Sequence, residues 1–429
     1  MTPVKMRLDN ASNIYPAALT KKYASIFRMS VTLSETVNVN ILQQALNTTI
    51  ERIPLYAYTL RNGAFWWYLK KLEKLPTIGE YTPVQDKRGF KFHGGFLFKV
   101  SVNDKTIYLD VFHALGDGRG GQTFLLTLTA EYLRMRYHLS SIEYNKLVLN
   151  PRERARSEEI SDCFNYFSGK KGALEQNELA YHIPGHKIMF NELNRERFVL
   201  DACQTKEVCK QYGCTVTELL TAAMVSALQQ IYIRDKRRRK KTALKVSVPV
   251  DLRQFFPGET LRNFSSYVNV GVNVDNGLFD FDEIVKIVVS QKKALSLPCE
   301  LERKIAANVA LEDNMAVSAI PLFIKHPVID FICRVKGDRY CSQTFSNLGY
   351  VRLPEAIAPY IKEMDFILGR QRGTSGAASA VGYDGKIFVN FTRNIAESDF
   401  EEYFAAQLRD LGIVPLNLSE RRSSELQTA

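Results

Sequence analysis

Cysteine is scarce in this chain, and the cysteines present lack the spacing of a disulfide framework. The 429 residues include seven cysteines, an odd number, and no C-x-x-C pair. A chain of this length can bury enough apolar surface to fold without disulfides. The cysteines are therefore interpreted as reduced thiols, and a cytoplasmic location is expected.

Sequence clusters of metal-binding residues are also missing. Cys203, Cys209 and Cys214 are spaced too widely for a local zinc knuckle. His182 and His186 are separated by a Pro-Gly pair, which argues against a shared helical face. No catalytic metal is predicted.

Long hydrophobic runs do not occur either. Met1 to Asn13 is polar, unlike the apolar core of a secretory signal. The longest apolar stretch, Ala316 to Val335, is interrupted by two prolines, Lys325, His326 and Asp330, so no membrane span is expected. A hydrophobic content of 45%, with 25 Phe and 20 Tyr, is typical of a globular protein rich in aromatic side chains.

What the chain does contain is a strand that leads into a turn with H-x-x-x-D-G spacing, in the sequence IYLDVFHALGDGRGG from Ile107 to Gly121. Apolar alternation from Phe96 to Val102 and the turn residues after it predict a hairpin whose second strand ends at Phe112. His113 then lies at a strand end. A neutral imidazole there is suited to accept a proton near neutral pH, since its unperturbed pKa is about 6.5.

The segment after His113 is expected to turn and then to form a helix from Thr123 to Tyr137. Gly118, Gly120 and Gly121 are expected to give the turn positive φ and to leave the imidazole uncrowded. Two other interpretations stay open here. The glycines also match G-x-G-x-x-G, although a hairpin strand is the wrong context for a dinucleotide site. His113 and the glycines could also serve an ordinary structural role.

Strands and helices are predicted in both halves of the chain. Further strands are expected near 25–33, 56–61, 65–69, 196–200, 244–250, 267–274, 364–370, 377–383 and 386–391. Helices are expected at 39–53, 215–234, 281–295 and 398–411, the last with a capping box between Ser398 and Glu401. Residues 139–194 lack periodicity and are expected to connect the two halves.

The whole chain presents an ordered series of short motifs. In order they are Arg7-Leu-Asp-Asn-Ala, Tyr15-Pro, the helix-like Val39 to Ile53 followed by Pro54, His113-Ala-Leu-Gly-Asp-Gly118, Val248-Pro-Val-Asp-Leu-Arg253 followed by Asn263, Phe345-Ser-Asn-Leu-Gly349, and a hairpin around Asp384-Gly385. This series resembles the coenzyme-A-dependent acyltransferase superfamily, which includes chloramphenicol acetyltransferase, condensation domains of peptide synthetases, polyketide-associated acyltransferases and alcohol O-acetyltransferases. The opening segment is most similar to stand-alone bacterial alcohol acetyltransferases.

The resemblance implies an α/β fold, a mixed-sheet α/β sandwich of two chloramphenicol-acetyltransferase-like subdomains with an active-site tunnel between them. Residues 1–175 would form the N-terminal subdomain and residues 176–429 the C-terminal one. It also implies that Asp117 and Gly118 are structural residues at the active site, and that Asp117 forms an ion pair with Arg253. An ordinary surface position for Arg253 is the alternative.

The resemblance further implies transfer of an acyl group, expected to be acetyl, from a coenzyme A thioester to an alcohol, with His113 as general base. The chain has no G-x-S-x-G motif, so direct transfer without an acyl-enzyme is expected. Acyl-coenzyme A would be a co-substrate and no cofactor would stay bound. Ser346 and Asn347 could donate hydrogen bonds to the oxyanion or line the tunnel, with turn formation as the alternative.

Departures from the family favour a free-standing enzyme, expected to be a monomer. Phe112 occupies the position where condensation domains usually carry a second histidine, the D-F-G-W-G of the plant branch is missing, and no carrier-protein domain is fused. A carrier-protein-dependent condensation-like module, a module that only binds, and an amine acceptor remain alternatives.

Positive charge is in excess, with a net charge of +11 and the run KRRRKK at Lys236 to Lys241. A solvated loop is the ordinary interpretation of such a run. Attraction of coenzyme A phosphates or an acidic carrier protein is the functional one. Nucleic-acid binding is not expected, because no nucleic-acid module accompanies the run.

Overall fold

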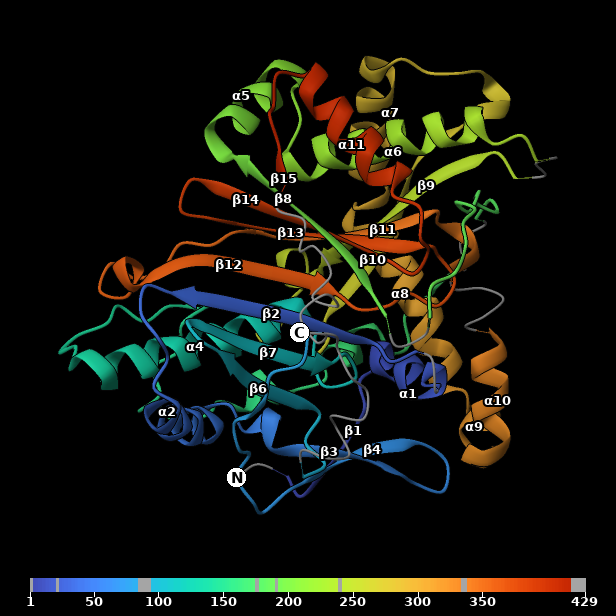
Figure 1. Cartoon of the computed structure of the whole chain (residues 1–429). Coiled ribbons are helices and arrows are strands. Elements are labelled where there is room, and N and C mark those ends of the chain that lie inside the picture. Colours follow the sequence, from blue (N-terminus) through green and yellow to red (C-terminus); the bar gives the residue numbers. More distant parts are fainter. Residues whose placement is uncertain are drawn as a thin grey trace.

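The computed structural model describes residues 3–20, 23–83, 94–173, 177–189, 192–237, 241–332 and 338–417. Across these residues the strands form a sheet of five strands, a sheet of seven and a small sheet of three. Figure 1 shows the two larger sheets side by side at the centre, with helices on their outer faces. This mixed α/β arrangement is the predicted fold class.

The strands of the five-stranded sheet follow the order β12-β2-β7-β6-β5 and those of the three-stranded sheet the order β1-β4-β3. Their bounds are β12 (Ile361–Leu368), β2 (Ile26–Leu33), β7 (Thr106–Phe112), β6 (Phe98–Asn103), β5 (Gly79–Glu80), β1 (Lys5–Arg7), β4 (Trp67–Lys71) and β3 (Tyr58–Asn62). The hairpin of β6 and β7 is the predicted one, and Asp104 at its turn has a φ of 49°.

The seven-stranded sheet has the order β10-β9-β11-β13-β14-β8-β15. The bounds are β10 (Ser265–Asn273), β9 (Ala243–Asp251), β11 (Gln343–Tyr350), β13 (Gly376–Tyr383), β14 (Lys386–Arg393), β8 (Asn194–Asp201) and β15 (Leu416–Asn417). β11 runs parallel to both β9 and β13, whereas the other pairs are antiparallel.

The helices longer than one turn pack on or beside these sheets. They are α1 (Ile14–Ala18), α2 (Val39–Arg52), α4 (Gly118–Tyr137), α5 (Ala202–Tyr212), α6 (Val216–Arg234), α7 (Phe281–Leu295), α8 (Pro298–Asp313), α10 (Leu322–Ile332) and α11 (Asp399–Asp410), with the short α9 (Met315–Ser318) before α10. α2 and α4 cover the five-stranded sheet, and α6, α7 and α11 cover the seven-stranded one (Figure 1).

α6 is long and apolar enough, by length and composition, to cross a membrane. However, 72% of its apolar window is buried inside the protein. It packs against α7, α11 and β9, so it is the core helix of this layer.

The strand β12 belongs to the second half of the sequence but completes the sheet of the first half. It pairs antiparallel with β2 from Leu368↔Phe27 to Ile361↔Leu33. It also packs against β13 and β14 of the other sheet. A strand from the second half of the sequence therefore joins the two sheets. The subdomain boundary after residue 175 stays a prediction.

Several local predictions need correction. Ser398 forms no cap bond with the helix backbone; its hydroxyl donates to Glu402 at 2.6 Å instead, and Glu401 is buried next to Arg393. The capping box was wrong because tertiary burial takes the Glu401 carboxylate into the core. The segment 345–349, for which a turn was the alternative, lies in strand β11 beside β13, with a register shift between Asn347 and Tyr350 and a φ of 78° at Gly349.

Candidate active site

His113 follows the last residue of β7, and the start of β2 and helix α1 hold it. Its backbone N–H donates to Ser25 O at 2.8 Å, which continues the β2–β7 ladder by one residue. The half-buried ring stacks on Tyr15 of α1, with ring centroids 4.4 Å apart and planes at 18°, and meets the ring of Phe27 edge-on at 5.3 Å. Two aromatic neighbours thus fix the plane of the imidazole.

Asn263 fixes the tautomer of that imidazole. The Asn263 Nδ2 group donates to His113 O at 2.9 Å and to Ser12 Oγ at 2.8 Å, so the amide oxygen must be the atom that faces the ring. Oδ1 lies 3.0 Å from His113 Nδ1. Nδ1 therefore carries the proton, and Nε2 keeps the lone pair that a general base requires.

Burial keeps this histidine neutral. Desolvation lowers the pKa of His113 below 6.5, and it outweighs the hydrogen bonds and the charge of Asp117, which act in the opposite direction. The base form of the ring consequently dominates at neutral pH.

Asn263 is itself anchored by a buried polar chain. Ser12, which accepts from Asn263, donates through its hydroxyl to Asp9 Oδ1 at 2.5 Å. Asp9 lies 3.5 Å from the guanidinium of Arg262, the residue before Asn263. Burial raises the pKa of Asp9 to about 6, although Arg262 and Ser12 favour its ionised form. Asp9 and Ser12 of the N-terminal segment thus hold Asn263 in the position from which it orients His113.

Asp117 caps the helix that follows the His113 turn. It is the N-cap residue of α4 and accepts from Gly120 N at 3.0 Å. Its other oxygen accepts from Phe264 N at 3.0 Å and from Arg253 Nη1 at 2.9 Å. The ion pair expected between Asp117 and Arg253 is present, and both side chains are largely buried.

Arg253 also binds backbone carbonyl groups of the loop before β10. Its guanidinium donates to Thr260 O at 2.9 Å and to Arg262 O at 2.7 Å. Burial alone would lower the pKa of Arg253, but the carboxylates of Asp117 and Asp251 outweigh that effect and raise it. The pair therefore clamps the start of α4 to the loop that carries Asn263.

The glycines of the motif serve close packing rather than positive φ. Gly118, Gly120 and Gly121 are absent from the positive-φ residues and lie in the first turn of α4. A Cβ on Gly120 would lie 2.1 Å from Leu261 O, and one on Gly118 would lie 2.8 Å from Leu348 Cδ2. The expectation of positive φ was wrong because the helix starts at Gly118 instead of Thr123.

The structure separates Ser346 and Asn347 by the alternation of strand β11. Asn347 turns toward α6, where its Nδ2 donates to Thr217 Oγ1 at 3.1 Å, and its Oδ1 accepts from Gly349 N at 2.9 Å. Leu348 reaches the start of α4 at Gly118. Ser346 is two positions away from Leu348, on the face of the strand opposite to Asn347. The register of β11 shifts between Asn347 and Tyr350, so alternation relates Ser346 to Asn347 but does not extend to Leu348.

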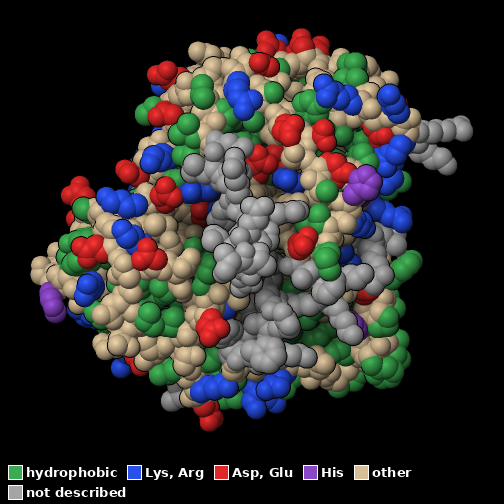
Figure 2. Space-filling model, viewed as in Figure 1, with side chains coloured by type: hydrophobic (Ala, Val, Ile, Leu, Met, Phe, Trp, Pro, Cys, Tyr) green, Lys and Arg blue, Asp and Glu red, His purple; other side chains and the backbone are tan. Residues whose placement is uncertain are grey.

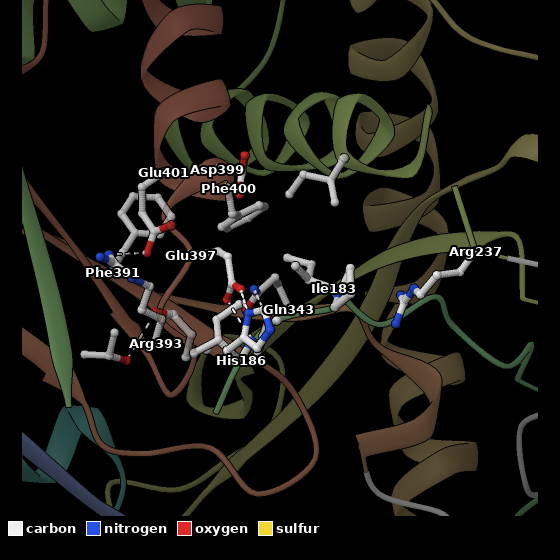
Figure 3. A pocket seen from close by; sticks show the side chains of 18 residues that line it. Ile183, His186, Arg237, Gln343, Phe391, Arg393, Glu397, Asp399, Phe400 and Glu401 are labelled. Atoms are coloured by element: carbon white, nitrogen blue, oxygen red, sulfur yellow. Dashed lines mark hydrogen bonds and ion pairs between the residues drawn. The ribbon is translucent and has the colours of Figure 1, made fainter. Parts of the chain in front are cut away.

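His113 is not among the residues that line the two described cavities. A cavity of about 400 Å³ opens between the start of β13, the end of β14 and α11, and Figure 3 shows His186, Gln343, Arg393, Glu397 and Glu401 around it. A polar cavity of about 170 Å³ is lined by Asn10, Asn13 and Glu312, among other residues. His113 lines neither cavity, and the tunnel stays an implication of the fold.

Part of the basic run can be placed. Arg237 forms an ion pair with Asp235 at 2.9 Å and lines the larger cavity, whereas Arg238, Arg239 and Lys240 lie outside the described residues. Cys163, Cys203, Cys209, Cys214 and Cys299 are free thiols. Within the same ranges, no group of three or more His, Cys, Asp or Glu is close enough together to hold a metal ion.

Sequence reasoning assigned no role to Tyr15 and Asn263, which the fold brings to His113. Both residues stand within the motifs that carry the family resemblance, and that was the only available signal. Tyr15 lies 98 positions and Asn263 lies 150 positions from His113 along the chain, so the contacts cannot be inferred before the fold is known.

Comparison with known proteins agrees with this architecture. A family model described as alcohol acetyltransferase matches residues 192–367. TRI101 of F. graminearum, solved with coenzyme A and deoxynivalenol, superposes with a TM-score of 0.66 at 9% identity, covering 96% of this chain and 100% of that one. TRI3, a trichothecene 15-O-acetyltransferase from Fusarium sporotrichioides, gives 0.60 at 11% identity, with 95% and 94% covered.

A nonribosomal peptide synthetase from Lecanicillium sp is 23% identical over 141 residues, which are 32% of this chain and 2% of that protein. The chain therefore spans a small fraction of this curated relative. The protein has the fold of coenzyme-A-dependent acetyltransferases and condensation domains, and its resemblance to that superfamily is confirmed.

Proposed function

We propose that this protein transfers an acyl group, in the first instance acetyl, from a coenzyme A thioester to an alcohol by direct attack. The observation that carries the proposal is the orientation of His113. Asn263 holds the Nδ1–H form, and burial keeps the ring neutral, so Nε2 is a base at neutral pH. A positioned base of this kind contributes about two to four orders of magnitude to a rate.

In the reaction His113 Nε2 accepts the hydroxyl proton of the acceptor as its oxygen bonds to the thioester carbon. The tetrahedral intermediate then collapses with cleavage of the carbon–sulfur bond. The imidazolium proton is returned to the sulfur, so an ester and the free thiol of coenzyme A leave. Ser346 is the candidate donor to the oxyanion, because it lies on the face of β11 opposite to Asn347, whose amide group already donates to Thr217 Oγ1.

The substrate classes rest on similarity. The family model is described as alcohol acetyltransferase, and TRI101 binds coenzyme A together with deoxynivalenol in its crystal structure. A coenzyme A donor and an alcohol acceptor are the simplest pair for the present chain. An amine acceptor or a donor on a carrier protein would use the same base. The match to a peptide synthetase supports the carrier-protein donor as an alternative.

The test is acyl transfer by the purified protein with acetyl- and longer acyl-coenzyme A and a panel of alcohols and amines. Thiol release and product mass are followed, and carrier-bound donors form a separate arm. We expect acceptor-dependent thiol release with an alcohol and a matching ester mass. Tight binding of the same compounds with no turnover would instead indicate a module that only binds.

The first variant prediction is that His113→Ala lowers kcat by about two to four orders of magnitude while the protein stays folded. His138→Asn is the matched control, because His138 lies at the far end of α4 with a φ of 54°, which asparagine tolerates. Kinetics and a thermal melt are measured for both variants. Retention of most activity in folded His113→Ala would refute the assignment.

A further inference from the structure

The helix α10 exposes apolar side chains on its outer side, although Leu322 and Ile329 pack inward on the core. Its buried positions include Lys325, which is 3% exposed, whereas Phe323 is 78% and Phe331 64% exposed. Ile324 and Val328 share the outward side with these two rings at helical spacing. An isolated exposed apolar side chain is common, but a complete apolar face turned to solvent marks an interaction surface.

Specific contacts with the tip of the β3–β4 hairpin hold α10 in this orientation. Lys325 Nζ donates to Phe65 O at 3.1 Å and lies 3.4 Å from the centroid of the Trp66 ring. Leu322 N donates to Ala64 O at 2.8 Å. The hairpin adds its own exposed ring, Phe65. We use the name apolar outer face for Phe65, Met315, Ile320, Phe323, Ile324, Val328 and Phe331.

Basic side chains lie on the strands of the same hairpin and on β1. Lys5 pairs with Lys70 across β1 and β4, and Arg7 and Arg61 both lie opposite Tyr68. These four basic residues are exposed, and the three strands contain no acidic residue. In Figure 2, Lys and Arg side chains gather at the lower edge over this sheet, and hydrophobic ones gather beside them at the lower right, over the α9–α10 region.

We propose that the apolar outer face and the basic three-stranded sheet together form a docking surface for an anionic lipid membrane. Aromatic and aliphatic side chains that protrude from a helix, flanked by Lys and Arg, are the combination that inserts into the interface of a bilayer with acidic headgroups. The net charge of +11 acts in the same direction. A membrane accepts protruding side chains without a matching groove, and this favours lipid over a second protein as the occupant.

The position of this surface also bears on the proposed function, and this step rests on that function. α10 packs against α1, and Tyr15 of α1 stacks on His113. A membrane at α10 would therefore lie one helix away from the base. This arrangement suits an apolar alcohol that is dissolved in the lipid.

The binding test needs no activity. The full-length protein is sedimented at low salt with vesicles of phosphatidylcholine, either pure or containing about one third phosphatidylserine. We expect binding to the anionic vesicles, weakened about tenfold or more by Phe323→Ser/Phe331→Ser. Leu278→Ser, at a side chain 62% exposed elsewhere, should bind like the wild type. Lys5→Glu/Lys70→Glu should weaken binding, whereas Lys286→Glu/Lys293→Glu on α7 should have less effect.

Thermal melts first establish that each variant is folded. Absence of vesicle binding by the wild type, or unchanged binding by Phe323→Ser/Phe331→Ser, would overturn the proposal. A dimer in solution that Phe323→Ser/Phe331→Ser dissociates would assign the face to a second copy instead. In a separate arm, this variant should lose transfer to a long-chain alcohol in vesicles but keep transfer to a short soluble alcohol. Loss of both would count against the link between the surface and the site.

Discussion

At the scale of single residues, the central feature is that neighbouring side chains fix the tautomer and the orientation of the His113 ring. His113 supplies the nitrogen, but Asn263 determines which nitrogen is free and Tyr15 determines the plane of the ring. An asparagine can do this only when its own donors are used elsewhere. The carbonyl of His113 and the hydroxyl of Ser12 fulfil that condition.

Replacement of Asn263 should change the pH profile as well as the rate. The active form of His113 is neutral and its pKa lies below 6.5, so kcat/KM of the wild type should decline only below that pH. Asn263→Asp places a carboxylate at Nδ1, which favours the imidazolium, so the acidic limb should move to higher pH. Asn263→Ala should lower kcat because the tautomer is no longer fixed.

The measurement is kcat/KM and kcat from pH 5 to 9 for the three proteins. A purely structural role for Asn263 would reduce stability while leaving the position of the acidic limb unchanged. Stability has a related pH dependence. Because the unfolded chain binds a proton at the ordinary pKa of histidine and folded His113 resists it, this residue should reduce stability as the pH falls through about 6.5.

At the scale of elements, the start of α4 is clamped to the other half of the chain. Asp117 caps the helix and pairs with Arg253, and Gly120 lets the helix approach the backbone of Leu261. The His113 turn is therefore held from both sides of the interface.

A double-mutant cycle on this clamp should show strong coupling. Asp117→Ala and Arg253→Ala should each cost about 3 to 5 kcal/mol. Arg253→Ala leaves the buried Asp117 carboxylate without its counter-ion, and Asp117→Ala removes the cap of α4 and leaves Arg253 with Asp251 as its remaining partner charge. The double variant should be little worse than either single one, because the same interaction is lost only once. Urea unfolding gives the four free energies.

The exposed pair Lys146 and Glu259 provides a matched control, and its coupling should stay below about 1 kcal/mol. Strictly additive losses at Asp117 and Arg253 would mean that the ion pair contributes nothing to the interface. The cap function of Asp117 predicts a slightly larger loss for its variant than for Arg253→Ala.

At the scale of the whole molecule, β12 prevents the two halves from being independent. It completes the sheet of the first half and packs on the sheet of the second, so separation would expose the edge and face of both. We expect a single cooperative thermal transition that coincides by calorimetry, far-UV circular dichroism and tryptophan fluorescence. Two resolved transitions, each assignable to one half, would contradict this expectation.

Much of this architecture could be predicted from the sequence because local patterns survive tertiary packing. The β6–β7 hairpin, the helices near 39–52, 216–234 and 281–295, and most strands are found where their periodicities indicate. Patterns left the role of residues 345–349 open, because Ser, Asn and Gly also favour turns. Pairing with β13 makes this segment part of strand β11.

The sequence by itself determined the chemistry that is available. It contains a histidine at a strand end, an aspartate four residues later and an arginine after a distant strand, in an order that resembles one superfamily. These statements depend on short-range patterns and on residue types, which need no coordinates.

The tertiary structure decided which nitrogen of His113 carries the proton and which keeps its lone pair. Asn263 and Tyr15 lie 150 and 98 positions from His113, and only the closure of the sheets brings them to its ring. The turn of Asn347 toward α6 and the outward face of α10 depend on the same packing. The physical reason is that hydrogen bonds and burial act over a few ångströms in space, whereas a sequence records proximity only along the chain.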